Sequence, residues 1–251
     1  FKGLRACSGI SFEIAKGETL AVIGPNGAGK TTLVNAITGA VAIEAGGSVR
    51  LATDAGVEEL TRLRPDAIVR LGMVRTFQNV LLIPHLSVRE NVLLGSYVHQ
   101  RTSILANMLG SKSAQQEAAR HADEADQVLA MLDLTQLASS NVTSLAYGVR
   151  KRVELARALV MRPRVLLLDE PVAGMSREER DEMASFVRKV KTSLPEMSLL
   201  LIEHDMKFVM SLSDRVLAMS AGRPLAIGTP SEVQADPRVL EAYLGPDDDA
   251  R

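Results

Sequence analysis

Eight residues near the N-terminus combine the features that hold a phosphate group. They read Gly24-Pro25-Asn26-Gly27-Ala28-Gly29-Lys30-Thr31 and follow an apolar run at residues 19–23. In this spacing, glycines let backbone N–H groups approach phosphate oxygens, and the lysine adds a positive charge. The threonine hydroxyl can bind Mg²⁺, and a helix that begins near Lys30 would direct its positive end at the anion. An ordinary glycine-rich turn is the alternative, but the apolar strand before it and the apolar helix after it favour a nucleoside triphosphate site.

Two adjacent carboxylates, Asp169 and Glu170, follow a second apolar run at residues 165–168. Such a run is typical of a strand buried on both faces, and open α/β sheets bind ligands at the carboxyl ends of their strands. Asp169 suits Mg²⁺, directly or through water, and Glu170 is a candidate general base for the water that attacks the γ-phosphorus. Either carboxylate alone could simply end a strand. Together with the phosphate loop, they predict hydrolysis of the triphosphate.

A histidine follows the third apolar run, at residues 199–202. There the chain reads Glu203-His204-Asp205, so His204 could reach a γ-phosphate from a neighbouring strand end. A lone histidine at a strand end is usually structural, and its functional interpretation depends on the motifs around it.

The composition narrows the class of protein. The chain has 251 residues, 46% of them hydrophobic, a net charge of −1 and a single cysteine. This content is enough for a buried core, and the near-zero charge disfavours nucleic acid as a partner. One cysteine cannot form an internal disulfide, and no apolar run approaches the roughly 18–20 residues of a membrane span. We therefore expect any membrane association to depend on a partner. The chain begins with Phe1 instead of Met, which favours a segment taken from a longer polypeptide.

The pattern of apolar residues predicts the elements that position these groups. Strands are expected at residues 10–24, 48–51, 72–76, 165–168 and 199–202, and helices at residues 30–37 and 177–191. Strands that alternate with helices indicate a mostly parallel sheet, so the fold class is α/β. Residues 228–232 combine a turn with a helix cap.

Between residues 86 and 161 the pattern is helical instead. One apolar stripe recurs at helical spacing, and its members are Ala118, Ala122, Ala125, Leu129 and Leu132. A last helix repeats the pattern with Val149, Val153, Ala156 and Val160, and its basic residues Arg150, Lys151, Arg152 and Arg157 are interpreted mostly as a solvated face. We predict an α/β core of residues 1–85 and 162–230, a helical subdomain of residues 86–161, and a C-terminal helix and tail of residues 231–251.

With these motifs, the chain resembles the ATP-binding cassette (ABC) ATPase subunits of membrane transporters over essentially its full length. The loop resembles their Walker A motif, Asp169 and Glu170 their Walker B motif with its catalytic glutamate, and His204 their switch histidine. Gln78, in Arg75-Thr76-Phe77-Gln78-Asn79, resembles the glutamine of their Q-loop. Phe1 precedes Lys30 by 29 residues, where the family has an aromatic residue that stacks on adenine. The resemblance implies a P-loop NTPase (RecA-like) core with an antiparallel β portion and an inserted helical subdomain.

Four segments are similar to one branch of this family, the importers of branched-chain amino acids. They are residues 72–80, 86–95, 173–175 and 203–206. For such a protein we expect ATP hydrolysis that powers import of branched-chain amino acids or a related small polar solute. The cargo itself is not encoded in this chain, because the permease and the solute-binding protein select it.

The resemblance also assigns roles to single residues. It makes Glu170, His204, Gln78 and Lys30 catalytic, and Thr31, Gln78 and Asp169 ligands of Mg²⁺. ATP would contact Phe1, Gly24, Pro25, Asn26, Gly27, Ala28, Gly29, Lys30, Thr31 and Thr32 of one subunit, and Leu145, Ala146, Tyr147 and Gly148 of the other. The implied partners are a second ATPase subunit, transmembrane permease subunits and, indirectly, a solute-binding protein, at the cytoplasmic face of the plasma membrane.

Two places depart from the family pattern. The signature reads Leu145-Ala146-Tyr147-Gly148-Val149, where this branch has Leu-Ser-Tyr-Gly-Gln, so a serine hydroxyl and a glutamine are missing. The helix N-terminus and the N–H of Gly148 should still face the phosphate, since they need no side chain. A lost hydrogen bond to a charged group removes roughly 1.5–3 kcal/mol, so we predict a weakened site on the partner's nucleotide. Ser176 replaces the aspartate of the D-loop.

Three alternatives remain open at this level. The chain could be the ATPase of a lipid or lipopolysaccharide exporter, a non-transport cassette that acts as a nucleotide-gated clamp, or a regulatory cassette that only binds nucleotide. The altered signature favours the last, whereas Glu170 and His204 favour hydrolysis. Pairing as a homodimer or as a heterodimer also stays open.

Overall fold

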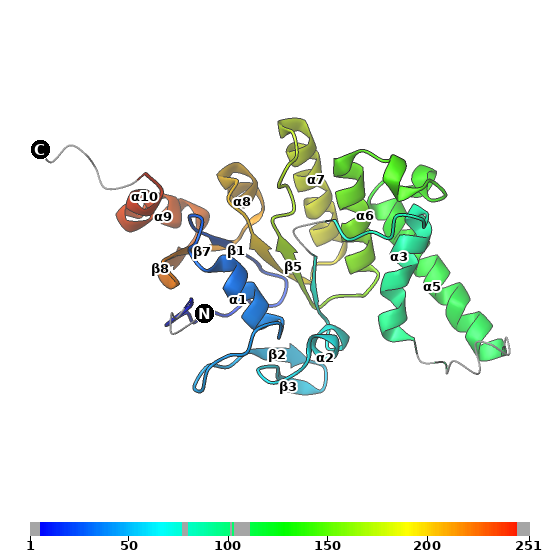
Figure 1. Cartoon of the computed structure of the whole chain (residues 1–251), viewed down its shortest axis with the longest axis horizontal. Helices are drawn as coiled ribbons and strands as arrows, with labels where there is room; N and C mark the ends of the chain where they lie inside the picture. Colours follow the sequence, from blue (N-terminus) through cyan, green and yellow to red (C-terminus); the bar gives the residue numbers. More distant parts are fainter. Residues whose placement is uncertain (1–5, 77–79, 101, 103–110, 245–251) are drawn as a thin grey trace, which may run out of the picture.

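A six-stranded sheet forms the centre of the protein in a computed structural model (Figure 1), which describes residues 6–76, 80–100, 102 and 111–244. The strands are β4 (Met73–Arg75), β5 (Val165–Asp169), β6 (Ser198–Ile202), β1 (Thr19–Ile23), β7 (Arg215–Ser220) and β8 (Arg223–Gly228), in this spatial order. All neighbouring pairs are parallel except β7 and β8, which are antiparallel. The predicted α/β fold with a mostly parallel sheet is confirmed.

Helices cover both faces of this sheet, and the strand residues alternate accordingly. In β1, Leu20 and Val22 belong to the core on the side of α1 (Lys30–Ile37), whereas Ala21 and Ile23 belong to the opposite core. That second core includes apolar residues of α7 (Arg177–Ser193) and α8 (Met206–Leu212). Two short helices, α9 (Pro230–Ala235) and α10 (Pro237–Leu244), lie beside β8.

A small antiparallel sheet lies at the edge of the core. It pairs β2 (Arg50–Thr53) with β3 (Gly56–Glu59), and α2 (Pro65–Arg70) leads from it to β4. The prediction of one strand over residues 10–24 was wrong, because only β1 is in a ladder. Ile10, Phe12 and Ile14 do turn inward against the core at alternate positions, which explains the strand-like pattern. A turn at residues 16–17 then separates this extended segment from β1.

Between β4 and β5, the described part of the chain forms three main helices. They are α3 (Val88–Ser96), α5 (Lys112–Met131) and α6 (Tyr147–Leu159), joined in part by short 3₁₀ turns at Tyr97–His99, Thr135–Leu137 and Val142–Ser144. Figure 1 shows them together at one end of the molecule. Ala125, Leu129 and Leu132 of the predicted stripe are buried, whereas Ala118 is exposed.

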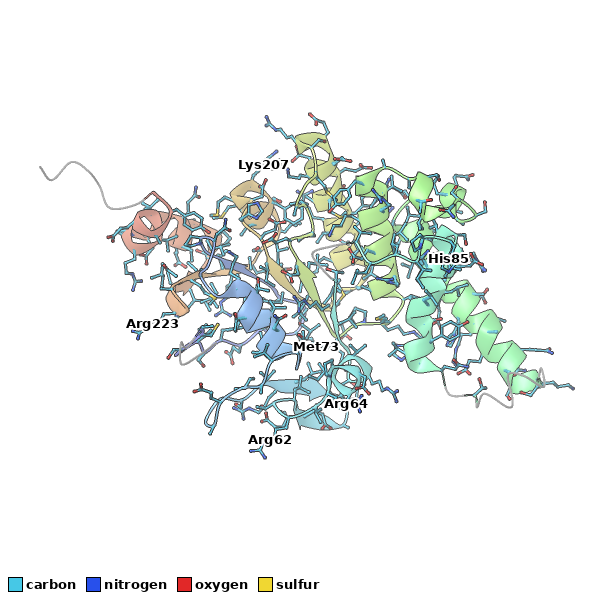
Figure 2. The ribbon with its side chains drawn as sticks, viewed as in Figure 1. Arg62, Arg64, Met73, His85, Lys207 and Arg223 are labelled. Carbon is cyan, nitrogen blue, oxygen red and sulfur yellow. The ribbon has the colours of Figure 1, made fainter. Side chains whose placement is uncertain are left out.

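The basic residues of α6 are not a solvated face, so that interpretation was wrong. Lys151 is 4% exposed, and its ammonium lies 3.5 Å from the carboxylate of Glu154, which is itself buried. Arg157 donates to the carbonyl oxygen of Leu81 at 2.6 Å. The reason is that α3, α5 and α7 pack around α6, so few of its faces meet solvent. Elsewhere charged side chains do point outward, as Figure 2 shows for Arg62, Lys207 and Arg223.

Candidate phosphate-binding and hydrolytic site

The predicted phosphate loop connects β1 to α1. Its backbone is left-handed at Gly27 and Gly29, with φ of 82° and 98°. At Gly24 an added Cβ would lie 2.3 Å from the carbonyl oxygen of Met219, so only glycine fits there. The Lys30 ammonium donates to the carbonyl oxygens of Gly24 at 2.6 Å and of Pro25 at 3.2 Å, and therefore lies inside the curve of the loop. The predicted strand–loop–helix geometry is confirmed.

The N-terminus of α1 is suited to an anion. Its N-cap, Gly29, gives no side-chain hydrogen bond, and the first turn of the helix has no acidic residue. In α3, α7 and α9, by contrast, a capping box satisfies the first N–H groups with side-chain oxygens. The first N–H groups of α1 are therefore left for phosphate oxygens, which the positive end of the helix dipole also attracts.

A hairpin that the sequence interpretation missed supports this loop. The N–H of Gly222, between β7 and β8, donates to the carbonyl oxygen of Ala28 at 3.0 Å. Its own carbonyl accepts from the N–H of Ser8 at 2.8 Å. Ala221 and Gly222 both have positive φ, 46° and 75°, as a tight hairpin turn requires. The pair Ala-Gly is a weak turn signal in the sequence, since alanine does not favour positive φ.

Strand pairing brings the remaining predicted groups to the same edge of the sheet. β1 and β5 are both parallel neighbours of β6, and Asp169 lies opposite Ile202. The N–H of Glu170 donates to the carbonyl oxygen of Ile202 at 2.9 Å, so Glu170 and His204 follow adjacent strand ends. Glu170 has φ of 47°, a left-handed turn that directs the chain away from β5. The predicted cluster of Lys30, Asp169, Glu170 and His204 is therefore assembled by the topology.

Electrostatics within this cluster connect the loop to the strand ends. Burial lowers the pKa of the Lys30 ammonium, and the carboxylates of Glu170, Glu203 and Asp169 oppose that effect. Burial of a charged amine favours its neutral form, whereas nearby negative charge favours the ammonium. An incoming triphosphate would add further negative charge and stabilise the charged lysine.

Asp169 has a partner that the sequence interpretation missed. Its carboxylate pairs with the Arg75 guanidinium at 2.5 Å, and Arg75 also donates to the side-chain oxygen of Asn35 in α1 at 2.7 Å.

Among the described residues, no group of three or more histidine, cysteine or acidic side chains is arranged to hold a metal. One carboxylate and one hydroxyl still fit Mg²⁺, which usually binds few protein ligands and keeps water and phosphate oxygens as the others.

Two predicted site residues, Phe1 and Gln78, lie outside the described residues. The contacts of adenine with Phe1 and of the metal with Gln78 therefore stay predictions.

The signature residues lie in the helical insert, at the start of α6. Ala146 is the N-cap of this helix, with φ of −57° and ψ of 154°, and provides no side-chain hydrogen bond. The ring of Tyr147 lies beside Gly174 in the segment after β5. The carboxylate of Glu179 is close to Gly148, since a Cβ added there would be 2.8 Å from its Oε1.

The serine at the D-loop position keeps one structural property of an aspartate. Ser176 is the N-cap of α7, its hydroxyl accepts from the N–H of Glu179, and the Glu179 carboxylate accepts from the N–H of Ser176 at 2.8 Å. Serine and aspartate cap helices about equally well. The replacement therefore leaves the start of α7 intact.

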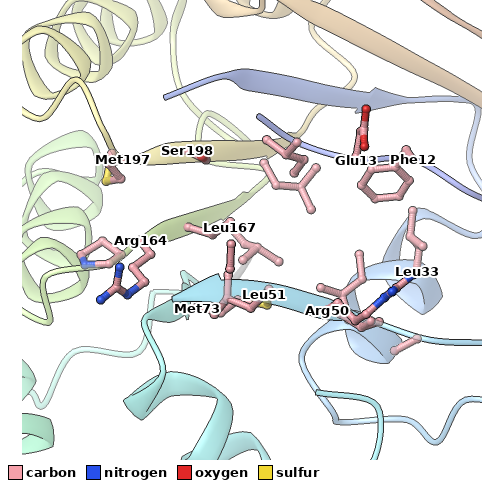
Figure 3. Close-up of a pocket in the computed structure, with 18 of the residues that line it drawn as sticks. Phe12, Glu13, Leu33, Arg50, Leu51, Met73, Arg164, Leu167, Met197 and Ser198 are labelled. Atoms are coloured by element: carbon pink, nitrogen blue, oxygen red, sulfur yellow. The ribbon is translucent and has the colours of Figure 1, made fainter. Parts of the chain in front are cut away.

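A large cavity lies elsewhere in the part of the chain that the structure describes. It has a volume of about 1660 Å³ and lies between the segment at residues 10–14, β2 and the core, with Phe12, Leu51, Met73 and Leu167 in its wall (Figure 3). None of residues 24–31, 169–170 or 203–204 lines it. Of the predicted site residues, the cavity includes Thr32, whereas Lys30, Asp169, Glu170 and His204 lie outside its wall. The phosphate loop with the neighbouring strand ends, and not this cavity, is therefore the candidate site. In the part of the chain that the structure describes, no helix is both long and apolar enough to cross a membrane.

Comparisons with family models match two parts of the chain. Residues 7–173 match the ABC transporter family, and residues 223–248 match the branched-chain amino acid ATP-binding cassette transporter family. The second match includes the whole of β8, α9 and α10, where the sequence interpretation found a turn and a helix cap but no functional motif.

Several characterised proteins are similar over nearly the full chain. The high-affinity branched-chain amino acid transport ATP-binding protein BraF of Pseudomonas aeruginosa is 39% identical over 245 residues, 98% of this chain and 94% of that protein. LivG of Escherichia coli is 37% identical with the same coverage. The probable LivG of Methanocaldococcus jannaschii is 31% identical over 249 residues, 98% of this chain and 93% of that protein.

Solved structures show the same fold. The ADP conformation of MJ1267, an ATP-binding cassette of an ABC transporter, has a TM-score of 0.81 and 30% identity, with 98% of this chain and 95% of that chain covered. A dimeric structure of the cassette MJ0796 has a TM-score of 0.72 and 22% identity, with 90% and 91% covered, and it supports the fold alone.

Proposed function

The chain belongs to the ABC transporter family, in its branched-chain amino acid group, and on that premise we propose which of its residues bind and hydrolyse ATP. It is the ATP-binding and ATP-hydrolysing subunit of a branched-chain amino acid importer. The branched-chain family model and the relatives BraF and LivG favour the importer over the exporter and the non-transport alternatives. The remaining question is how the described geometry performs the hydrolysis.

The β and γ phosphates bind to the loop between β1 and α1. The N–H groups of residues 27–31 donate to the phosphate oxygens, and the positive end of the α1 dipole attracts them. Lys30 exchanges its hydrogen bonds to the carbonyl oxygens of Gly24 and Pro25 for bonds to phosphate. These donors are in place before ATP arrives, so they stabilise the charge that develops on the transferred phosphoryl group without reorganisation.

Glu170 orients the attacking water and accepts its proton, and His204 holds the γ-phosphate. The observation that supports this proposal is the parallel pairing of β5, β6 and β1, because Glu170, His204 and the phosphate loop follow the carboxyl ends of these neighbouring strands. Thr31, Asp169 and Gln78 would hold Mg²⁺, which, when bound, would neutralise charge between the β and γ phosphates. To bind Mg²⁺, the Asp169 carboxylate would have to give up part of its ion pair with Arg75.

The complete site needs a second subunit. The signature at residues 145–148 begins α6 in the helical insert and would complete the phosphate site of a partner ATPase subunit. The two ATPase subunits would close around ATP, and the permease subunits would be moved by this closure at the cytoplasmic face of the membrane, where ATP is available. A solute-binding protein would deliver a branched-chain amino acid or a related small polar solute.

Replacing Glu170 with glutamine tests the mechanism. We expect Glu170→Gln to bind ATP normally and to hydrolyse it about 10²–10⁴ times more slowly, as is typical when a general base is removed. The measurements are ATP affinity and steady-state phosphate release by the assembled transporter complex. Turnover close to that of the unmodified complex would contradict the role of Glu170.

A further inference from the structure

Glu203 is a buried carboxylate for which the mechanism above has no use. It directly follows β6 and is 0% exposed. Its Oε1 accepts a hydrogen bond from the N–H of Val172 at 3.1 Å, and its Oε2 accepts from the N–H groups of His204 at 2.9 Å and Asp205 at 3.3 Å. Burial of a carboxylate costs several kcal/mol unless hydrogen bonds compensate. Three backbone donors at one side chain are that compensation.

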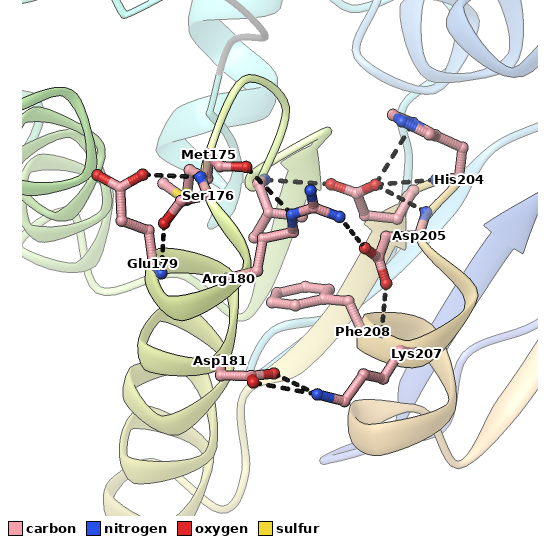
Figure 4. A network of polar contacts seen from close by, with 11 residues as sticks. Met175, Ser176, Glu179, Arg180, Asp181, His204, Asp205, Lys207 and Phe208 are labelled. Carbon is pink, nitrogen blue, oxygen red and sulfur yellow. Dashed lines mark hydrogen bonds and ion pairs between the residues drawn. The ribbon is translucent and has the colours of Figure 1, made fainter.

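These bonds join the two loops that carry the proposed catalytic groups. Val172 is two residues after Glu170, and His204 directly follows Glu203. One carboxylate therefore fixes the segment after β5 to the segment after β6, at the level where both leave the sheet. Figure 4 shows the second of these segments, with His204 and Asp205 labelled.

The same carboxylate also faces the imidazole. Nδ1 of His204 lies 3.5 Å from Oε2 of Glu203, although the histidine side chain is 58% exposed. At this distance the carboxylate is a close electrostatic neighbour of the imidazole. A long exposed side chain without such a neighbour would sample several rotamers.

A second tie lies further out on the same two loops. Arg180 of α7 donates to the Asp205 carboxylate at 2.6 Å and to the carbonyl oxygen of Met175 at 3.2 Å. Asp205 in turn caps α8 by accepting from the N–H of Phe208. Arg180 therefore also holds the loop of His204 to the end of the D-loop. Figure 4 shows Arg180 between Met175 and Asp205.

We propose that Glu203 is a positioning residue for ATP hydrolysis: it holds the loop of His204 against the segment after Glu170 and orients the imidazole with Nδ1 toward itself. Nε2 then points away from the carboxylate, toward the place of the γ-phosphate. A partner subunit that displaces the D-loop would move His204 through the same bonds. The inference rests on the proposed role of His204, and its test separates the two.

The test is a double-mutant cycle in the assembled transporter complex. Glu203→Gln keeps the shape of the side chain but places an NH₂ group against a backbone N–H. We expect kcat to fall tenfold or more and ATP affinity to change less than about twofold, because the phosphate loop is untouched. His204→Ala should lower kcat strongly. If Glu203 acts through His204, Glu203→Gln added to His204→Ala should lower kcat by less than about twofold more, since coupled residues are not additive.

Each outcome is decisive. Full additivity of the two changes, or loss of ATP affinity in Glu203→Gln, would overturn the inference and leave the proposed function standing. Normal kcat in His204→Ala would instead overturn the proposed role of His204. Asp181→Asn is the control, because Asp181 pairs with Lys207 at 2.7 Å and also joins α7 to α8, but touches neither loop. Its kcat should be unchanged.

A second variant covers the case in which Glu203→Gln does not fold. Arg180→Gln removes the outer tie at a side chain that is 41% exposed, so we expect a folded protein. It should lower kcat less than Glu203→Gln would and should also be non-additive with His204→Ala. Unchanged kcat in Arg180→Gln would contradict the inference in that case.

Discussion

The ammonium of Lys30 is desolvated before any nucleotide arrives. Its side chain lies inside the phosphate loop, and burial lowers its pKa below the ordinary value of 10.5, while Glu170, Glu203 and Asp169 oppose the shift. Phosphate binding needs the charged form of this lysine. The protein therefore keeps its main phosphate-binding charge in a place where that charge is sensitive to alkaline pH.

This environment predicts how ATP affinity depends on pH. Because the pKa of Lys30 is lowered, the ammonium loses its proton at a lower pH than an exposed lysine would. ATP affinity should therefore begin to decrease below pH 10.5, in a range where most exposed lysines still carry their charge. Titration of the affinity with a fluorescent ATP analogue measures this. Lys30→Arg, whose charge persists at these pH values, should bind more weakly overall and lack the alkaline decrease. The same decrease in both proteins would contradict the prediction.

A second residue-scale prediction concerns Ala146, the N-cap of α6. Alanine is a poor N-cap, and here it gives no side-chain hydrogen bond. Ala146→Ser should stabilise the chain by about 1 kcal/mol, because the hydroxyl can accept from an N–H in the first helical turn. Urea unfolding measures the change. Ala119→Ser, at an exposed position inside α5, is the control and should be neutral or slightly destabilising. Equal effects in both variants would show that the cap is not responsible.

At the scale of elements, the hairpin of β7 and β8 supports the phosphate loop. A backbone hydrogen bond runs from the N–H of Gly222 to the carbonyl oxygen of Ala28, and Ser8 of the N-terminal segment donates to the carbonyl oxygen of Gly222. A Cβ at Gly222 would lie 2.4 Å from the carbonyl oxygen of Ala6. The three segments therefore fit together only with glycine at this turn.

Gly222→Ala should weaken both stability and ATP binding. The left-handed φ of 75° costs alanine about 1–2 kcal/mol, and the clash with Ala6 adds about 1–3 kcal/mol. Gly9→Ala is the matched control, since its φ is 65° and no atom lies within 4 Å of the added Cβ. Thermal unfolding and ATP affinity measure both variants. If Gly9→Ala reduces ATP affinity as much as Gly222→Ala does, the hairpin does not support the loop.

At the scale of the whole molecule, the proposed function assigns the two half-sites of this chain to different nucleotides. The phosphate loop, Glu170 and His204 would act on the nucleotide of this subunit, whereas the signature at the start of α6 would act on that of its partner. The defect left by Ala146 and Val149 should therefore appear at the partner's site.

This arrangement is tested by changing the signature of this chain and measuring ATP turnover at the partner's site. In a complex with a different ATPase subunit, this chain with Glu170→Gln has its own site silenced. Adding Ala146→Ser and Val149→Gln should then raise the remaining ATP turnover, up to about ten- to a hundredfold, because the restored hydrogen bonds reach the partner's phosphate. No increase would show that the signature of this chain does not limit the partner's site. In a complex with two copies of this chain, Glu170→Gln silences both sites, and no increase is expected.

The sequence alone was enough to predict the phosphate loop, the two carboxylates after β5 and the histidine after β6. Their signals are local, because a glycine, a lysine or a carboxylate at a fixed spacing is needed whatever the rest of the chain does. The helices and buried strands were predicted for a similar reason, since apolar periodicity reports burial directly.

Only the tertiary structure decided which groups meet across the fold. The pairing of Arg75 with Asp169, the support of Ala28 by Gly222 and the three bonds to Glu203 join residues far apart in sequence, and no spacing rule encodes them. The same cause explains the two errors. The basic residues of α6 are buried or partly buried because three helices pack around it. Residues 10–18 have a strand pattern, but in the part of the chain that the structure describes no strand pairs with them. Burial and pairing are properties of the assembled chain, whereas the phosphate loop carries its chemistry in eight consecutive residues.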